Sequence, residues 1–396
     1  MKRVVLPMAL LFTQGCINLD QEYQVKDLRI LAMRVDPPEL LYSFLHLAPS
    51  NQRGPIPLGP YSVTAQVLAV DPQGRDVEVN VRLCPETDEA DGCEGYKVRE
   101  NAPAEEIRAV VPLVHPTTTT RKADLELGGE LAVPSQHFTF TSPAVDYMLL
   151  HDADGRLSFN SIIFPSTPSF VVRMTVPGTE ETEVAFKRFV LSMDISPQGL
   201  TPEQREPLEE LFTSFLGLGF CPEGTDPEAD VQCIKRRVPN KNPTLERVLY
   251  RLGDKLEPGF DRDDVTSGGQ LTDFSGRVKV EAGRIVRLRP VVASDDRQPY
   301  QAFNYNLQER KVELKNFTED MVFSWYTTSG AIDPISADDI TPQPDVYYQI
   351  SADTPAGPSY VWVVVRDQRG GVDWRRLDFE ITAPRATSEG IIPGLF

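Results

Sequence analysis

The stretch YVWVVV at residues 360–365 decides the fold class. Six consecutive apolar residues, four of them valine, are typical of a strand in the core of a β-sandwich. The pentapeptide DQRGG at 367–371 follows and has the composition of a turn. Residues 372–381 then run as another strand. The sequence therefore predicts a β domain around this strand, turn and strand.

Further strands surround this pair in the C-terminal part. All three tryptophans of the chain lie here, and Ala282-Gly283 has the composition of a turn between two strands. We predict strands at Arg277–Ala282, Arg284–Val292, Met321–Tyr326 and Tyr347–Ser351. About seven short strands with an early tryptophan favour an immunoglobulin-like sandwich over 244–384, followed by a tail at 385–396. No cysteine pair spans its sheets, so it is not an antibody-type domain.

The N-terminal part has the same strand-and-turn pattern. Pro37-Pro38 ends the first strand, because proline donates no hydrogen bond to a sheet. The last two strands, separated by Pro177-Gly178, predict a closing β-hairpin. The predicted strands are Leu28–Val35, Tyr61–Val70, Val77–Leu83, Ile107–Val114, Gln136–Thr141, Ser169–Val176 and Glu183–Met193. We expect a sandwich domain over 28–195.

A single helix is predicted between these parts. Thr201, Pro202 and Gln204 form a start signal, with threonine at the cap and proline at the first helical position. One apolar stripe follows at Leu208, Leu211, Phe212, Phe215 and Leu216, before Gly217. The stripe favours packing on a neighbouring sheet over a membrane or partner surface. The predicted fold is mostly β, with two immunoglobulin-like β-sandwich domains joined by a small helical, disulfide-stapled insert at 196–243.

The five cysteines suggest two local disulfides and one special residue. Cys84 with Cys93 and Cys221 with Cys233 each close a short loop, worth roughly 2–3 kcal/mol on the chain-entropy model. A metal site is the alternative, but neither pair has Cys-x-x-Cys spacing or a nearby histidine. The odd cysteine is Cys16.

Cys16 ends a segment that has the features of an export signal. Residues 1–15 have a basic start at Lys2-Arg3, an apolar run too short to span a bilayer, and Gly15 before the cysteine. This order is typical of a bacterial lipoprotein signal, with Cys16 as the lipidation site and 16–27 as a tether. Thr13 and Gln14 depart from the usual pattern, so an ordinary signal peptide that leaves Cys16 as a free thiol is the alternative.

The acidic charge limits the classes of partner that the chain can bind. The formal net charge is −18, and removing Lys2 and Arg3 with the signal makes it −20. Such a chain repels the phosphate backbone, so we expect no nucleic-acid partner. It also repels anionic headgroups, so a lipid rather than a basic patch would hold it to a membrane.

No catalytic or metal-binding motif is present. The four histidines form no His-Glu-x-x-His motif, and no Gly-x-Ser-x-Gly elbow occurs. We therefore predict no catalytic residue, no metal site and no cofactor. Asp152 and Asp154 are a weak calcium alternative, since the terminal glutamate of a full calcium loop is absent and a hairpin turn explains them better.

One hairpin is rich in arginine. Its basic residues are Arg366, Arg369, Arg375 and Arg376. Surface charge balanced by Asp367 and Asp373 is one interpretation. A basic patch that docks an acidic partner or polysaccharide is the other.

The chain resembles exported Gram-negative lipoproteins that pair a cysteine-terminated signal with immunoglobulin-like domains. The resemblance rests on residues 28–38, on FSWY at 323–326 and on VVRDQRGGVDW at 364–374, about a tenth of the chain. These are fold-level features, and they imply no reaction.

Two functions remain open from the sequence. The first is a membrane-anchored cell-envelope lipoprotein, a non-enzymatic binding or structural module that contacts proteins or glycans. The alternative is a carbohydrate-active envelope hydrolase that uses loop carboxylates. The residue after Cys16 is Ile17 rather than an aspartate, and an aspartate at this position resembles an inner-membrane retention signal. We therefore expect lipid anchoring in the outer membrane.

Overall fold

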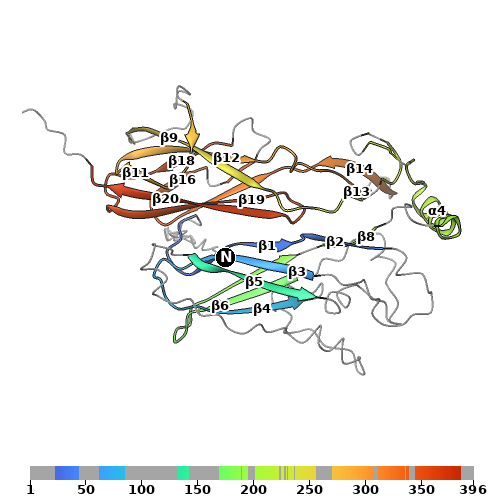
Figure 1. The fold of residues 1–396 in the computed structure, drawn as a ribbon, viewed down its shortest axis with the longest axis horizontal. Helices are drawn as coiled ribbons and strands as arrows, with labels where there is room; N and C mark the ends of the chain where they lie inside the picture. Colours follow the sequence, from blue (N-terminus) through green and yellow to red (C-terminus); the bar gives the residue numbers. More distant parts are fainter. Residues whose placement is uncertain are drawn as a thin grey trace, which may run out of the picture.

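The computed structural model describes most of the chain from residue 23 onward (Figure 1). The described ranges are 23–43, 62–84, 132–141, 169–188, 190–194, 201–222, 224–226, 229, 231–235, 237–255, 270–306, 311–334, 336–338 and 344–384. This part is mostly β. Several predictions lie outside it: Cys16, Cys93, Asp152, Asp154, the strand at 107–114 and the tail at 385–396.

Two five-stranded sheets form the C-terminal part. The first contains, in order, β10 (Thr272–Asp273), β9 (Leu245–Lys255), β12 (Arg284–Val292), β18 (Val346–Gln349) and β16 (Ala331–Asp333). The second contains β11 (Arg277–Glu281), β20 (Val372–Thr382), β19 (Gly357–Arg366), β15 (Val322–Thr327) and β17 (Ser336–Asp338). One apolar cluster joins residues of both sheets, including Val286 and Tyr348 from the first and Phe323 and Phe379 from the second.

Strand β19 is buried on both faces. Val361, Val363 and Val365 belong to the cluster between the two C-terminal sheets. The alternate residues Tyr360, Trp362 and Val364 belong to a second cluster, shared with residues of the N-terminal part. Successive side chains of a strand point to opposite faces, so a strand with two buried faces needs an uninterrupted apolar run. This is why 360–365 contains no polar residue.

The N-terminal part adds further sheets below the second C-terminal sheet (Figure 1). One contains β1 (Arg29–Asp36), β3 (Ser62–Val70) and β5 (Ala132–Thr141), and another contains β4 (Glu78–Cys84), β6 (Ser169–Thr175) and β7 (Thr182–Arg188). A parallel pair joins β2 (Glu39–Ser43) to β8 (Val190–Asp194). Leu31 and Ala32 of β1, with Leu68 and Val70 of β3, pack against β19 and β20.

One expectation about strand connections is corrected and another is refined. The segment predicted as one strand at Glu183–Met193 forms two: β7 pairs antiparallel with β6, whereas β8 pairs parallel with β2. The predicted turn at Ala282-Gly283 is present between β11 and β12, but these two strands do not pair with each other. Strand β11 pairs with β20 and β12 pairs with β9 and β18, so the turn carries the chain from one sheet to the other. Gly283 has a φ of 84°, which glycine adopts without strain.

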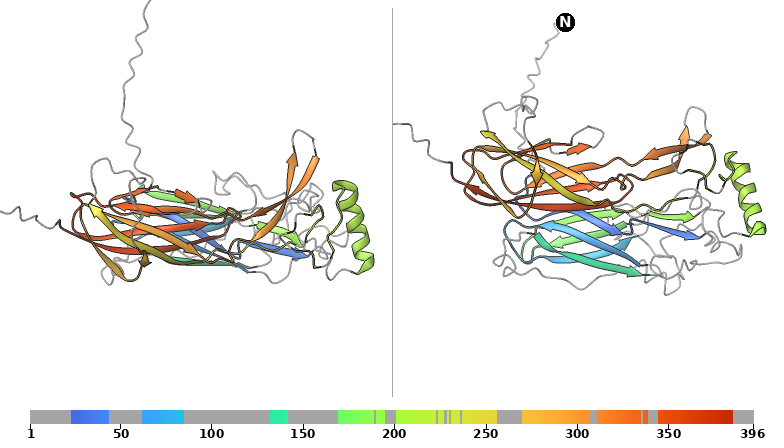
Figure 2. Two further views of the ribbon diagram at one scale, coloured as in Figure 1. Left: turned by 90° about the horizontal axis from the view of Figure 1, so that it is seen from above. Right: turned by 45° about the horizontal axis from the view of Figure 1, so that its top comes forward.

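Several strands were not predicted. The longest is β9, whose apolar positions are separated by arginine and glutamate residues. A two-stranded antiparallel hairpin of β13 (Pro299–Asn306) and β14 (Lys311–Thr318) projects from the C-terminal part, at the same end as the helix (Figure 2).

Helix α4 (Pro202–Leu216) forms where the sequence predicts it. Arg205 N donates to Thr201 O over 2.9 Å in its first turn, and Gly217 ends it with a φ of 66°. No helix in the described part of the chain has the length and apolar character to cross a membrane.

Candidate functional site

The turn between β19 and β20 places Arg369 at the junction of the N-terminal and C-terminal parts. Its guanidinium donates from Nη2 to Glu39 Oε2 over 3.0 Å and from Nη1 to Glu319 Oε1 over 2.6 Å. It also lies 4.5 Å from the centre of the Tyr300 ring. The Arg369 side chain is only 11% exposed, and Glu39 and Glu319 are buried. We call these three charged residues the Arg369 cluster.

The shape of the turn points Arg369 inward. Asp367, which is buried, accepts hydrogen bonds at Oδ1 from Arg369 N and Gly371 N, both over 2.8 Å. Gln368 has a φ of 65°, which is unusual for a residue other than glycine. A Cβ at Gly371 would lie 2.1 Å from Asp367 Oδ2 and 2.7 Å from Lys241 O, so only glycine fits there. Backbone strain of this kind is tolerated where the surroundings enforce it.

Glu39 is held by a second arginine and by a backbone amide, both from the segment that precedes β9. Arg237 Nε donates to Glu39 Oε1 over 2.7 Å, and Asn240 N donates to Oε2 over 2.8 Å. Burial by itself would raise the pKa of Glu39. Arg237, Arg369 and the Asn240 amide outweigh this effect and hold that pKa below its usual value.

Glu319 behaves in the opposite way. Burial, with a smaller contribution from the negative charge of Asp367, raises the pKa of Glu319 to about 7. Arg369 and the hydrogen bond from Gln298 N, over 3.2 Å, counteract this rise only in part. The Arg369 cluster therefore contains one carboxylate that stays ionised and one that titrates near neutral pH.

A lysine on β7 lies close enough to the same turn to interact with it electrostatically. Burial lowers the pKa of Lys187 to about 8, Arg366 lowers it further, and Asp367 opposes the shift. Asp367 Oδ2 is buried and has no hydrogen-bond partner in the described part of the chain. Electrostatic attraction between Lys187 and Asp367 thus acts across the junction.

The other three arginines of the hairpin also have partners within the chain. Arg366 donates to Ser324 Oγ over 2.9 Å and to Leu31 O over 3.3 Å, and so reaches β1. Arg376 donates to Asp378 over 2.8 Å, and its guanidinium lies 5.4 Å from the centre of the Tyr360 ring.

Arg375 is the most exposed of the four arginines. It donates a hydrogen bond to Glu246 O over 2.9 Å. Each of the four arginines of the predicted basic patch therefore has a hydrogen-bond partner within the chain.

Hydrogen bonds and an ion pair of Asn242, just before β9, and of Asp373, in β20, complete the junction. Asn242 donates from Nδ2 to Val35 O over 2.8 Å and accepts at Oδ1 from Val372 N over 3.0 Å. Asp373 accepts from Arg34 over 3.2 Å and from Leu245 N over 2.8 Å. Each of these side chains bridges segments far apart in the sequence.

The sequence did not identify Glu39 or Glu319 as part of this site. Glu39 begins β2 and Glu319 directly follows β14, and many exposed glutamates lie at such strand ends. Their role depends on burial next to Arg369, which no local pattern shows. Among the described residues, no group of three or more histidine, cysteine, aspartate or glutamate side chains is placed to hold a metal ion.

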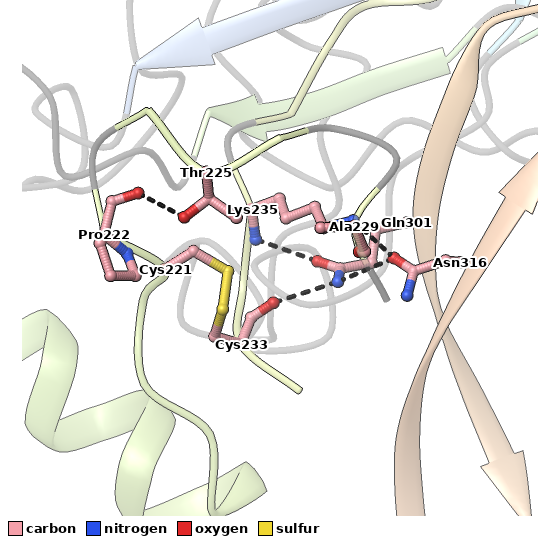
Figure 3. Close-up of a disulfide and its surroundings, with 8 residues drawn as sticks. All are labelled: Cys221, Pro222, Thr225, Ala229, Cys233, Lys235, Gln301 and Asn316. Carbon is pink, nitrogen blue, oxygen red and sulfur yellow. Dashed lines mark hydrogen bonds between the residues drawn. A yellow bond between two sulfur atoms is a disulfide. The ribbon is translucent and has the colours of Figure 1, made fainter. Parts of the chain in front are cut away.

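The predicted disulfide between Cys221 and Cys233 is present, with a Cα–Cα distance of 5.0 Å (Figure 3). It closes a loop directly after α4. The prediction for Cys84 and Cys93 lies outside what the structure describes, since Cys93 and the Cys84 side chain are not part of it.

Comparisons with known proteins identify no family. No protein-family model matches the chain, and neither does any curated protein. Among solved structures, the chain matches red sea bream transglutaminase at 8% identity and a TM-score of 0.18, with 90% of this chain and 32% of the other covered. It matches dimeric latent PorU from Porphyromonas gingivalis at 9% identity and a TM-score of 0.17, with 90% and 24% covered.

A third match is the CsuC–CsuE chaperone–tip adhesion subunit complex of Acinetobacter baumannii, at 9% identity and a TM-score of 0.19, with 89% and 99% covered. The chain thus spans about a third of the transglutaminase and a quarter of PorU. With TM-scores this low, the conclusions about fold and function rest on the chain's own residues.

Proposed function

We propose that this chain is a membrane-anchored cell-envelope lipoprotein, a non-enzymatic binding or structural module that contacts proteins or glycans. One observation carries the proposal: the first described residues are built into the folded body. Val25 N donates to Thr327 O over 2.9 Å, and Thr327 N donates to Tyr23 O over 2.8 Å. Gln24 Nε2 donates to Gly330 O over 2.7 Å, and Val25 is buried.

This attachment leaves a short link to the proposed lipid. Residues 17–22, six in number, separate Cys16 from Tyr23. At about 3.3–3.6 Å per extended residue, the link reaches roughly 20–25 Å. A lipid on Cys16 would therefore hold the Tyr23 end of the body close to the membrane.

The opposite end of the body would then face away from the membrane. Tyr23 and Gln24 lie beside the β15–β16 connection, whereas α4 and the β13–β14 hairpin lie at the other end of the molecule (Figure 1). We propose that partner proteins or glycans meet this distal end or the exposed Arg375. Arg369 is an unsuitable contact for a partner, since Glu39 and Glu319 already bind it.

The finer architecture is part of the same proposal. We interpret the two β parts as immunoglobulin-like sandwich domains, with 196–243 as the insert between them. The two apolar clusters that share β19 support packing of these domains into one body. Such a body would hold its partner-binding surfaces in fixed positions relative to one another.

Among the described residues, no observation specifically favours the hydrolase alternative. It needs an acid and a base or nucleophile on either side of a substrate. The two buried glutamates of the Arg369 cluster both hold the same guanidinium, which leaves neither one free to serve as the acid or the base. We therefore propose no reaction.

The anchoring proposal is tested by Cys16→Ser. We expect the variant to leave the membrane fraction, because several acyl chains bind firmly at about 0.8 kcal/mol per buried methylene. Ile17→Val is the matched control and should stay with the membrane. A Cys16→Ser protein that remains in the membrane fraction after a high-salt wash contradicts the lipid anchor.

The placement is tested by separating the two membranes by density. We expect the wild-type chain to co-sediment with outer-membrane markers. A peak with inner-membrane markers would reject the outer-membrane proposal, but it would leave the lipid anchor intact.

A further inference from the structure

The Cys221–Cys233 loop is fixed to helix α4. Its two ends pair with each other: Cys221 N donates to Ile234 O and Ile234 N donates to Gly219 O, both over 2.9 Å. Phe220 contacts Phe212 of α4 edge-to-face, with ring centres 5.6 Å apart, and the Phe212 side chain is buried. The two ends of the loop therefore have a defined position beside α4, at the distal end of the molecule.

The opposite side of this loop binds the β13–β14 hairpin (Figure 3). Gln301 Nε2 donates to Cys233 O over 3.1 Å, and Gln301 Oε1 accepts from Lys235 N over 3.0 Å. The backbone at the end of the loop offers one acceptor, Cys233 O, and the backbone just beyond it offers one donor, Lys235 N, which match both ends of the Gln301 side-chain amide.

A second hairpin residue reinforces this contact. Asn316 lies opposite Gln301 in the strand register and accepts at Oδ1 from Gln301 Nε2 over 3.3 Å. Lys235 Nζ donates to the same oxygen over 3.1 Å and also to Ala229 O within the loop. Both strands of the hairpin are therefore tied to the disulfide loop.

The other face of the hairpin contacts Arg369. Tyr300 and Phe317 form the neighbouring cross-strand pair, with ring centres 5.4 Å apart, and Arg369 lies over the Tyr300 ring. Since successive residues of a strand point to opposite faces, the 300/317 and 301/316 pairs lie on opposite faces. The disulfide loop thus holds one face of the hairpin and Arg369 holds the other.

We propose that the Cys221–Cys233 disulfide is a redox-sensitive clamp that sets the position of the β13–β14 hairpin. A two-stranded hairpin is marginally stable by itself in water, so its order depends on what it packs against. Reduction by a dithiol transfers two electrons and two protons to the disulfide, which becomes two thiols, while the dithiol becomes a disulfide. The loop then loses the shape that matches Gln301 and Asn316, and this face of the hairpin is released, while Arg369 still contacts Tyr300 and the two five-stranded sheets stay folded.

Hydrogen–deuterium exchange of the full chain tests this proposal. In Cys221→Ser/Cys233→Ser, we expect amides of 299–318 to exchange at least tenfold faster than in the oxidised wild type, and amides of 357–382 to keep their rates. Oxidised Gln301→Ala/Asn316→Ala should speed exchange in the same hairpin with the disulfide intact. Lys315→Ala, an exposed change on the same hairpin, is the matched control and should have no effect.

The outcomes distinguish a disulfide that orders only the hairpin from one that stabilises the whole fold. Unchanged exchange at 299–318 in both variants overturns the proposal. Equal loss of protection in the hairpin and in 357–382 also overturns it, because the disulfide would then stabilise the whole fold. If the double serine variant does not fold, wild type treated with dithiothreitol, with free thiols at 221 and 233 verified by mass, replaces it. The Gln301→Ala/Asn316→Ala variant still decides whether the loop contact orders the hairpin.

Discussion

Arg369 Nη2 donates a hydrogen bond to Glu39 Oε2 over 3.0 Å, although the two residues are 330 positions apart in the chain. Glu39 begins a short strand of the N-terminal part, and Arg369 lies in a turn of the C-terminal part. The same guanidinium also binds Glu319 and covers the Tyr300 ring. One side chain therefore connects three segments that are remote in sequence, and its removal should affect all of them.

Replacing Arg369 by methionine should lower the free energy of unfolding by about 3–5 kcal/mol, because it leaves two buried carboxylates without their shared partner. Urea unfolding monitored by tryptophan fluorescence measures this loss. The matched control is Arg247→Met, which breaks an ion pair with Asp273 whose side chains are 53% and 62% exposed, and it should cost less than about 1 kcal/mol. Equal small losses in both variants would contradict a structural role for the cluster.

Glu319 should make the free energy of unfolding depend on pH between 4.5 and about 7. Its folded-state pKa of about 7 lies above the ordinary value of 4.5, so the folded chain retains a proton that the unfolded chain has lost. The free energy of unfolding should therefore fall as the pH rises from 4.5 to 7 and then level off. Glu319→Gln should remove this slope, whereas the exposed Glu180→Gln should keep it. Urea titrations at pH 5, 6, 7 and 8 test the prediction, and a persistent slope in Glu319→Gln would refute it.

The two faces of β19 provide a matched pair of core variants. Val363 packs between the two C-terminal sheets, and Val364 packs against the N-terminal part; neither is exposed. If both interfaces are permanent, Val363→Ala and Val364→Ala should each cost about 2 kcal/mol, from lost apolar burial and a small cavity. Val184→Ala, at a residue that is 48% exposed, should cost much less. A near-zero cost for Val364→Ala would mean that the two parts separate readily.

Gly371→Ala should destabilise the turn that presents Arg369. The added Cβ would meet Asp367 Oδ2 and Lys241 O at distances well below van der Waals contact, so the backbone must shift. We expect a loss of about 2 kcal/mol or more in the free energy of unfolding. Gly219→Ala, where no atom lies within 4 Å of the new Cβ, is the control and should be near neutral. A neutral Gly371→Ala would show that the turn adapts without cost.

Local patterns in the sequence were enough to predict most strands and the helix. The apolar run at 360–365 is β19, the clean alternation at 77–83 largely matches β4, and the cap at Thr201 begins α4 at Pro202. Strand β9 escaped prediction because charged residues interrupt its apolar positions. The hairpin of β13 and β14 escaped as well. Short-range periodicity reports which faces a segment can bury, and these two segments have an ambiguous pattern.

Local sequence patterns were sufficient to predict that the chain is mostly β, where the helix begins, and that Cys221 and Cys233 are close enough in the chain to pair. They did not show that the chain changes sheets at Ala282-Gly283, that β19 belongs to two cores, or that Arg369 binds Glu39 and Glu319. Strand pairing and ion pairing join residues hundreds of positions apart, and burial, which turns an ordinary arginine into a shared partner of two carboxylates, is a property of the assembled layers.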